Sequence, residues 1–396
     1  MPKLRAPVLA GLLRWGAGTW LFWRVPNLRS PAAAAPSRSV RPPVSVVIPA
    51  RDEAASLPVL LGSLAAQSRR PEEVIVVDDA SADSTAEVAA SLGAKVLSAG
   101  DLPPGWSGKA WACALGAGAA SGETLVFLDA DTWLLPEGLD RLLAEHHALG
   151  GRGLVTAAPF HRAAGPGMTR RSAQSVAPRR PAQSAAPRPW PYERLSAMCN
   201  LVTTMGTGAF TPLGGWTRAV GSFGPCLVCA RAEYDSLGGH GALEDAMADD
   251  LSARFHQVGA PVRLVGGRGS VEYRMYPGGF AQLLEGWSKN LASGAAITRP
   301  FVLALVVAWV SGLITSAWRV ASPGRSARSV AAYLAYGLQV EWMLRRIGSF
   351  GRGAGLAYPV PLAVFLGCFA NSARLTFGRR EVRWKGRAVR VGPRRG

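Results

Sequence analysis

The sequence predicts a mixed α/β domain built on a parallel β-sheet, followed by membrane helices. Two observations lead to this fold class. From residue 44 onward, short apolar runs alternate with segments of helical periodicity, which is the pattern of strands joined by crossover helices. Beyond residue 300 there are uncharged runs of 18 residues or more, long enough to span a bilayer. A length of 396 residues accommodates both parts.

Five apolar runs are the predicted strands, and helical patterns fill the gaps between them. The runs cover residues 44–49, 73–79, 95–98, 124–131 and 153–160, and the helical patterns 53–67, 83–92, 109–120 and 135–148. Ligands of such sheets bind beyond the carboxyl ends of the strands. Acidic residues follow three of these ends: Asp52 and Glu53, then Asp78 and Asp79, then Asp129 and Asp131.

Six carboxylates gathered at one sheet edge repel each other unless cations or hydrogen-bond donors compensate them. Asp129 and Asp131 are separated by one alanine at a strand end, where the chain can turn so that both reach one ligand. Carboxylates so placed suit a hard divalent cation. Asp83, by contrast, is predicted to cap the following helix.

The positive charge is unevenly distributed. Of the formal charge of +18, 13 come from two segments: residues 379–395, with eight Lys/Arg and one acid, and residues 162–191, with six Arg and no acid. The rest is nearly balanced and has no basic motif interleaved with aromatics, which argues against a nucleic-acid partner. The Arg-, Pro-, Ala- and Ser-rich stretch 163–191 is predicted to be a disordered surface insert.

Five cysteines at scattered positions form no disulfide framework, which fits a reducing compartment. Cys226 and Cys229 make a single CxxC without a second pair at zinc-ligand spacing. They are interpreted as small apolar residues of a buried segment.

Two segments are predicted to cross a membrane. The runs 301–318 and 354–373 are uncharged, and the basic tail that follows favours a cytoplasmic C-terminus. Between them, 329–344 contains Gln339 and Glu341, so spanning, re-entrant and interfacial positions all stay open. With a cytoplasmic catalytic part, the number of crossings after residue 300 must be even. Residues 1–30 resemble an N-terminal anchor more than a signal peptide.

The motifs PVSVVIPARDEA, VIVVDDASADST, GWSGKAWA and VFLDADT, in this order over about 90 residues, resemble inverting family 2 glycosyltransferases of the GT-A fold, a Rossmann-like nucleotide-diphospho-sugar transferase domain. GSFGPCLVCARAEYDSLGGH, MADDLSARF, YRMYPGGFAQLLEGWSKN and VRWKGRAVRV resemble one membrane-bound branch, which glycosylates carotenoid carboxylic acids. The resemblance implies a GT-A domain over 42–298, membrane helices over 299–377 and a basic cytoplasmic tail over 378–396.

The resemblance also implies roles for the strand-end acids. The uridine of a UDP-sugar donor would be held by Asp52 or Glu53 and by Asp79. Asp129 would lie near the ribose, and Asp131 would bind Mg2+ or Mn2+ on the diphosphate; both belong to the DxD motif. Lys109 would place a second positive charge near the diphosphate.

The general base of the family is the last acid of an acidic pair before a helix. Asp249 and Asp250 match this pattern, with Asp250 favoured, although Glu244 and Asp245 form a similar pair nearby. The implied protein is a multi-pass cell-membrane enzyme that transfers a sugar, glucose in the favoured reading, to a lipophilic acceptor such as a carotenoid acid. Hopanoid, polyprenyl phosphate and glycerolipid acceptors stay open, as does a non-catalytic membrane scaffold.

Overall fold

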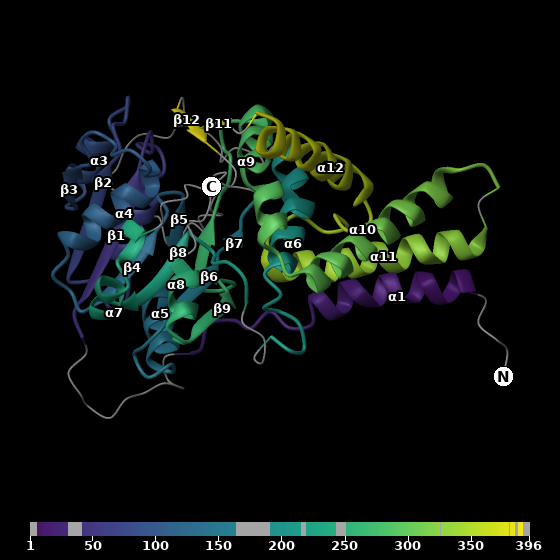
Figure 1. Ribbon diagram of the computed structural model, residues 1–396, viewed down its shortest axis with the longest axis horizontal. Helices are drawn as coiled ribbons and strands as arrows, with labels where there is room; N and C mark the ends of the chain where they lie inside the picture. Colours follow the sequence, from purple (N-terminus) through teal and green to yellow (C-terminus); the bar gives the residue numbers. More distant parts are fainter. Residues whose placement is uncertain are drawn as a thin grey trace, which may run out of the picture. The chain divides into compact units, whose positions relative to one another are not determined.

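A seven-stranded β-sheet is the centre of one of two compact units in the computed structural model (Figure 1). This sheet unit comprises Asn27–Trp190 and Gly221–Met275, and the helical unit comprises Met1–Pro26, Pro191–Val220 and Tyr276–Gly396. The structure describes residues 6–30, 42–163, 191–214, 219–242, 251–324, 326–379, 381–384 and 387–390. Most of the insert predicted over 163–191 therefore lies outside the described residues.

The strand order in the central sheet is β3-β2-β1-β4-β8-β6-β9. The strands are β1 (Val44–Ala50), β2 (Glu73–Asp78), β3 (Lys95–Ser98), β4 (Thr124–Leu128), β6 (Leu154–Ala158), β8 (Cys226–Ala230) and β9 (Val262–Gly266). All run parallel except β8, which pairs antiparallel with β4 and with β6. The five runs predicted as strands are thus parallel to one another, and the antiparallel strand is one that was not among them, β8. Its apolar run looks like that of its neighbours, because burial on both faces does not encode strand direction.

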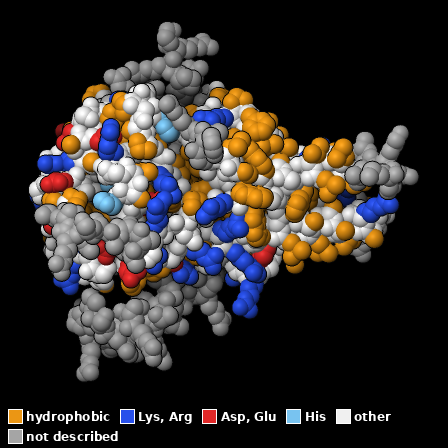
Figure 2. All heavy atoms as spheres, turned by 90° about the horizontal axis from the view of Figure 1, so that it is seen from below, with side chains coloured by type: hydrophobic (Ala, Val, Ile, Leu, Met, Phe, Trp, Pro, Cys, Tyr) orange, Lys and Arg blue, Asp and Glu red, His pale blue; other side chains and the backbone are white. Residues whose placement is uncertain are grey.

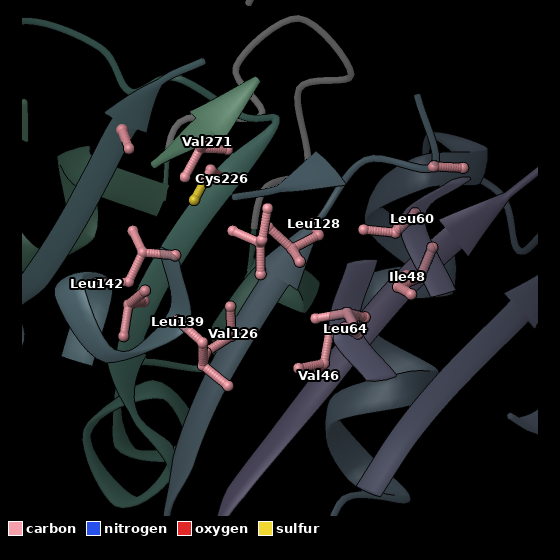
Figure 3. Packing of buried hydrophobic residues seen from close by; sticks show 14 of the residues in the cluster. Val46, Ile48, Leu60, Leu64, Val126, Leu128, Leu139, Leu142, Cys226 and Val271 are labelled. Atoms are coloured by element: carbon pink, nitrogen blue, oxygen red, sulfur yellow. The ribbon is translucent and has the colours of Figure 1, made fainter. Parts of the chain in front are cut away.

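Helices cover both faces of this sheet. They are α2 (Leu57–Ala65), α3 (Thr85–Ser91), α4 (Gly108–Gly118), α5 (Gly138–His147), α7 (Arg231–Ser236) and α8 (Leu251–Gln257), with the short 3-10 turn η3 (Gly239–Ala242). Successive strand residues belong to opposite cores: Val46 and Ile48 pack with α2 and α5, as Figure 3 shows, whereas Val47 packs with α4 and α8. This period of two places one apolar layer on each side of the sheet.

A second, smaller sheet follows directly from the DxD motif. It has the order β5-β10-β7, with β5 (Thr132–Leu134), β10 (Val271–Tyr273) and β7 (Phe160–His161). The apolar run 124–131 therefore ends as a strand at Leu128, and Asp129–Asp131 form the turn into β5. The run 153–160 is likewise divided between β6 and β7, which belong to different sheets.

The helical unit contains most of the C-terminal third of the chain. Its elements are α1 (Ala6–Leu21), η2 (Pro191–Ser196), α6 (Ala197–Gly206), α9 (Phe280–Ile297), α10 (Pro300–Ala321), α11 (Ala327–Ile347), α12 (Pro359–Ala373), η4 (Arg374–Arg379), β11 (Glu381–Trp384) and β12 (Arg387–Arg390). Within the part of the chain that the structure describes, two helices are long and apolar enough to be candidate membrane spans, Pro300–Ala321 and Pro359–Gly378.

Candidate active site

Three loops of the sheet unit leave the same edge of the parallel strands. β1 lies between β2 and β4, and the register pairs Ala50 with Asp78 and Val47 with Phe127. The segments that follow these three strands therefore begin side by side. The structure places five of the proposed donor-site acids on them: Asp52, Glu53, Asp79, Asp129 and Asp131.

The loops after β1 and β2 are fastened to each other by hydrogen bonds. The Asp52 backbone N–H donates to Ser81 Oγ at 2.9 Å, and Asp52 Oδ1 accepts from the Ala82 N–H at 2.7 Å. The Glu53 N–H donates to Thr85 Oγ1 at 2.8 Å. Asp52 adopts a left-handed conformation, with φ of 52°. One carboxylate oxygen of Asp52 is thus used within the protein to hold the second loop.

Asp79 is the most enclosed of these acids, with a relative exposure of 7%. Its N–H donates to the Ala50 carbonyl at 2.8 Å, which continues the pairing of β1 and β2. Arg51 Nη1 donates to the Asp79 carbonyl at 3.0 Å and lies 3.8 Å from Asp79 Oδ2. Arg51 is a residue that the sequence analysis missed, because an arginine beside a strand-end acid has no distinctive pattern. It compensates the negative charge of this loop pair.

The N-cap of α3 is Ser84, so the prediction that Asp83 occupies this position is wrong by one residue, although Asp83 accepts from the first N–H of the helix. Its Oδ1 accepts from the Thr85 N–H at 3.0 Å and its Oδ2 from the Ala54 N–H at 3.1 Å. Burial alone would raise the pKa of Asp83, but the hydrogen bonds from Thr85 and Ala54 lower it below the ordinary value. Asp83 therefore has a structural role, since it connects the loop after β1 with the start of α3.

The DxD segment is a tight turn held by its own backbone. The Asp129 carbonyl accepts from the Thr132 N–H at 3.0 Å and from Thr132 Oγ1 at 2.7 Å. The Asp129 N–H donates to the Pro225 carbonyl at 3.0 Å, next to the start of β8. The position of Asp129 is therefore set from both sides, by the following strand and by the antiparallel neighbour.

Lys109 forms an ion pair with the first acid of this motif. Its Nζ lies 2.8 Å from Asp129 Oδ1, and both side chains are partly exposed. Lys109 belongs to the first turn of α4, whose N-cap Ser107 accepts from the Ala110 N–H at 3.1 Å. The helix start thus carries a lysine toward the carboxyl edge of the sheet.

Asp131 adjoins the small sheet. Its carbonyl accepts from the Arg274 N–H at 3.3 Å, and Thr132 pairs with Tyr273 of β10. Burial raises the pKa of Tyr273, and the negative charge of Asp131 raises it further. Arg274 in turn affects His161 of β7: burial lowers the pKa of His161 to about 3, and the positive charge of Arg274 adds to this effect. The small sheet therefore has a neutral phenol, Tyr273 of β10, paired with a neutral imidazole, His161 of β7.

An ion pair between a partly exposed arginine and a buried glutamate supports β10, the middle strand of the small sheet. Arg162 Nε and Nη2 lie 2.7 and 2.6 Å from the two oxygens of Glu272, which is only 3% exposed. The Arg162 N–H also donates to the Tyr273 carbonyl at 2.9 Å. These two residues were missed from the sequence, because they lie 110 positions apart and only the β7–β10 pairing brings them together.

The acids of the turn suit a hard divalent cation. Among the residues that the structure describes, no group of three or more His, Cys, Asp or Glu side chains could enclose a metal by itself. Mg2+ is commonly bound by one or two carboxylates together with water and substrate phosphates, and Asp129 and Asp131 supply that oxygen chemistry. The donor set fits a metal that arrives with an anionic ligand better than a permanent structural metal.

The proposed base lies outside the described residues. This applies to Asp249 and Asp250 and also to the alternative pair Glu244 and Asp245. The described part of α8 begins at Leu251.

The remaining motif residues belong to the core. Cys226 and Cys229 are buried free thiols of β8. Burial raises the pKa of Cys226 to about 12 and raises that of Cys229 even further, so both stay protonated thiols at neutral pH. His240 Nδ1 lies 2.7 Å from the Tyr234 hydroxyl in the interior. The interpretation of Cys226 and Cys229 as small apolar residues of a buried segment agrees with their burial.

A mixed sheet of this order, with acidic loops at its carboxyl edge, defines a glycosyltransferase of the GT-A fold. The family model described as "Glycosyl transferase family 2" matches residues 45–211. A mannosyltransferase from Pyrobaculum calidifontis, solved in complex with GDP-Man and Mn2+, shares the fold. It has a TM-score of 0.52 and 18% sequence identity, over 95% of this chain and 97% of that chain.

Two relatives extend the similarity beyond the sheet unit. The 4,4'-diaponeurosporenoate glycosyltransferase of Staphylococcus haemolyticus is 34% identical over 358 residues, which cover 88% of each chain. The protein of the same name from Staphylococcus aureus strain MRSA252 is 31% identical over 360 residues, again 88% of each. The chain therefore belongs to the family 2 glycosyltransferases.

Proposed function

We propose that this protein is a membrane-associated inverting glycosyltransferase. It transfers a hexose from a UDP-sugar to a carotenoid carboxylic acid, and the hexose is glucose. The observation that carries the proposal is the alignment over 88% of both chains with relatives named 4,4'-diaponeurosporenoate glycosyltransferase. An alignment of this extent includes the helical unit as well as the sheet unit, and acceptor recognition requires more than the donor-binding edge of a sheet.

The donor diphosphate would bind at the turn that contains Asp129 and Asp131. Asp131 and Asp129 would hold the Mg2+ or Mn2+, which supplies positive charge that neutralises the departing diphosphate. Lys109, already 2.8 Å from Asp129, adds a protein cation at the same place. Thr132 keeps the turn fixed through its two hydrogen bonds to the Asp129 carbonyl.

The uridine would bind at the paired loops after β1 and β2. Asp79 and either Asp52 or Glu53 supply carboxylate acceptors for the N–H of the base and for ribose hydroxyls. One oxygen of Asp52 accepts from the Ala82 N–H, so the other oxygen of Asp52 or the Glu53 carboxylate would take this role. Arg51 and the cross-loop hydrogen bonds hold the acids in place before the donor arrives.

In the transfer, an acceptor oxygen forms a bond to the anomeric carbon as the bond from that carbon to the diphosphate oxygen breaks. The electron pair of the broken bond leaves with UDP, and the configuration at carbon is inverted. An alcohol acceptor must lose its proton to a base, for which Asp250 and then Asp249 are the proposed residues. A carboxylic acid is already ionised near neutral pH and attacks as the carboxylate, which yields a sugar ester.

The test is transfer by membranes that contain the wild-type protein or Asp131→Asn. They are incubated with UDP-glucose, Mg2+ or Mn2+ and lipids that contain a carotenoid acid, and mass spectrometry detects an added hexose. Asp235→Asn is the matched control, because it is the same change at an exposed acid of α7, outside the site. We expect a hexosyl ester from wild type and Asp235→Asn and a large loss with Asp131→Asn.

Different failures have different meanings. Release of UDP without the ester would contradict the carotenoid acceptor and retain the donor chemistry; a hexosylated hopanoid, polyprenyl phosphate or glycerolipid would replace it. A product from another nucleotide sugar alone would contradict UDP-glucose as the donor. Full activity of Asp131→Asn would contradict the assignment of Asp131 as a metal ligand.

A further inference from the structure

Three helices of the helical unit, α1, α10 and α11, contact each other in a way that fixes their relative directions. Trp20 of α1 lies edge-on to Phe301 near the start of α10, with ring centroids 5.8 Å apart, and Arg14 lies beside Gly312 further along α10. α1 and α10 are thus antiparallel. Trp15 Nε1 donates to the Ala335 carbonyl of α11 at 3.2 Å, and Phe22 contacts Trp342. α1 and α11 are thus parallel, and the three helices form one bundle (Figure 1).

Gln339, which left the position of α11 open in the sequence, connects all three helices of this bundle. Its Nε2 donates to the Trp15 carbonyl at 2.8 Å and to Thr19 Oγ1 at 2.7 Å. Its Oε1 accepts from Trp309 Nε1 at 2.8 Å. The side chain is 5% exposed, and its amide has partners at both ends. A polar residue whose hydrogen bonds are satisfied between helices is what an apolar solvent around the bundle requires.

Glu341, the other polar residue of α11, is compensated in the same way. Its Oε1 accepts from Arg345 at 3.0 Å, and its Oε2 accepts from the Gly355 N–H at 3.0 Å. Gly355 belongs to the segment between α11 and α12, which packs against the middle of α11. A Cβ at Gly355 would overlap the Gly337 carbonyl oxygen and the Glu341 backbone nitrogen, so the two backbones approach each other too closely for a side chain at Gly355.

The segment 348–358 therefore returns along the bundle instead of leaving it. Tyr333 of α11 donates to the Leu356 carbonyl, and the Tyr358 hydroxyl lies 2.8 Å from Ser316 Oγ of α10. Consecutive turns satisfy the backbone N–H groups of residues 354 and 356–358. α12 then runs back to Ser372, whose Oγ accepts from the Ala292 N–H of α9 at 2.9 Å. Irregular backbone at membrane depth is tolerated only when protein surrounds it in this way.

Two helices of the bundle, α10 and α11, have an arginine near both ends. Arg299 and Arg319 bracket α10, and Arg328 and Arg345 bracket α11; the pairs are about 30 and 26 Å apart along the helices. These spacings match the hydrocarbon thickness of a bilayer. Large apolar side chains on the outer faces are exposed: Leu12, Leu13, Phe301, Val307, Trp318, Leu334 and Leu338. Figure 2 shows hydrophobic side chains spread over the region on the right of the view.

We propose that α1, α10 and α11 cross the bilayer together, and that 348–373 is a re-entrant segment whose helix α12 does not cross. The outer surface of the bundle is then a lipid-binding surface. The N-terminus and the α10–α11 loop lie on one side of the membrane, and the C-terminal tail lies on the other. The even number of crossings expected after residue 300 is then made by α10, which contains the run 301–318, and by α11. The second predicted run, 354–373, does not cross. This proposal rests on the proposed membrane association.

Cysteine labelling on the full-length protein in sealed vesicles of both orientations tests this topology. All five native cysteines are buried, so they give a low background with a membrane-impermeable maleimide. Ser322→Cys probes the α10–α11 loop, and Arg352→Cys probes the segment after α11; neither residue belongs to the proposed active site. An N-terminal epitope tag, removed by added protease, gives an independent position.

We expect Ser322→Cys and the tag to react from one side and Arg352→Cys from the opposite side, with at least a tenfold preference in each case. Labelling of Ser322→Cys and Arg352→Cys from the same side would overturn the proposal, because α11 would not cross. A tag on the same side as Arg352→Cys would exclude α1 as a span. Extraction of the protein by alkaline carbonate would contradict membrane insertion itself, a failure distinct from a wrong number of crossings.

Discussion

Lys109 Nζ lies 2.8 Å from Asp129 Oδ1, so a cation from the start of α4 already neutralises one carboxylate of the DxD turn. The pair connects α4 with the turn after β4. Because both side chains are partly exposed, the ion pair by itself contributes at most about 1 kcal/mol to stability. Its position at the carboxyl edge of the sheet gives it more importance for binding an anionic donor than for folding.

Replacement of Lys109 by methionine is expected to lower kcat/KM for the UDP-sugar about 100-fold, because a positive charge near developing negative charge contributes roughly 3 kcal/mol. Steady-state kinetics of the purified protein measures the effect. Lys95→Met is the matched control, since Lys95 Nζ donates only to the Ala119 carbonyl at the surface. Equal kinetics of both variants would remove Lys109 from the donor site.

Removal of divalent metal is expected to weaken UDP binding as well as to stop transfer. Calorimetry with UDP is carried out after EDTA treatment and again after addition of Mg2+ or Mn2+. In wild type the metal should raise affinity at least tenfold, because the cation shares the diphosphate with the turn. In Asp131→Asn the increase should be largely lost. An unchanged UDP affinity in EDTA would argue that the turn binds the donor without metal.

The ion pair of Arg162 and Glu272 is expected to stabilise the small sheet beside Asp131. Arg162→Met would leave the Glu272 carboxylate, 3% exposed, without its bidentate partner, at a cost of about 3 kcal/mol. Glu272→Gln leaves no buried negative charge and should cost less. Thermal unfolding in detergent provides the comparison, and the double variant Arg162→Met/Glu272→Met should regain part of the loss. Equal melting temperatures for wild type and Arg162→Met would show that solvent replaces the arginine.

Acid should destabilise the sheet unit through Glu73. Burial alone would raise the pKa of Glu73, but hydrogen bonds from Ser45 and Ser121 lower it from 4.5 to about 2. Since the folded pKa is the lower one, the stabilisation is present above pH 4.5 and disappears as the pH falls toward 2. For this largely solvated group we expect about 1 kcal/mol.

The variant Glu73→Gln should therefore melt at a lower temperature than wild type at pH 7, and the difference should shrink below pH 4. Glu87→Gln, a change at an exposed position of α3, is the control and should follow wild type at every pH. A difference that stays constant down to pH 3 would assign the effect of Glu73→Gln to packing instead of charge.

The acids of the site could be predicted from the sequence because each follows an apolar run, and parallel strands bring their carboxyl ends to one edge. Asp79 and Asp129 lie on the loops after β2 and β4, the two strands on either side of β1, for this reason. The partners of these acids could not be predicted in the same way. Arg51 and Lys109 reach them through loop and helix geometry, and the Arg162–Glu272 pair depends on a sheet whose strands have two or three residues.

The direction of β8 and the environment of α11 were also hidden in the sequence. A strand buried on both faces has no alternation that marks its direction. Gln339 and Glu341 look unfavourable for a membrane when only their own helix is considered. Apart from Arg345 of the same helix, their partners come from α1, α10 and the segment before α12, and contacts between distant segments leave no periodic signal.

The need for Asp250, the proposed base, depends on the chemistry of the acceptor. If the acceptor is a carboxylic acid, it is ionised near neutral pH and has no proton to lose. Asp250→Asn should then reduce transfer to a carotenoid acid by less than tenfold, but reduce transfer to the corresponding carotenoid alcohol by 100-fold or more. Initial rates of sugar ester formation and of glycoside formation by the same membranes give the two ratios, and Asp249→Asn serves as the comparison. Equal losses on both acceptors would mean that Asp250 positions the substrates or the fold and does not accept a proton.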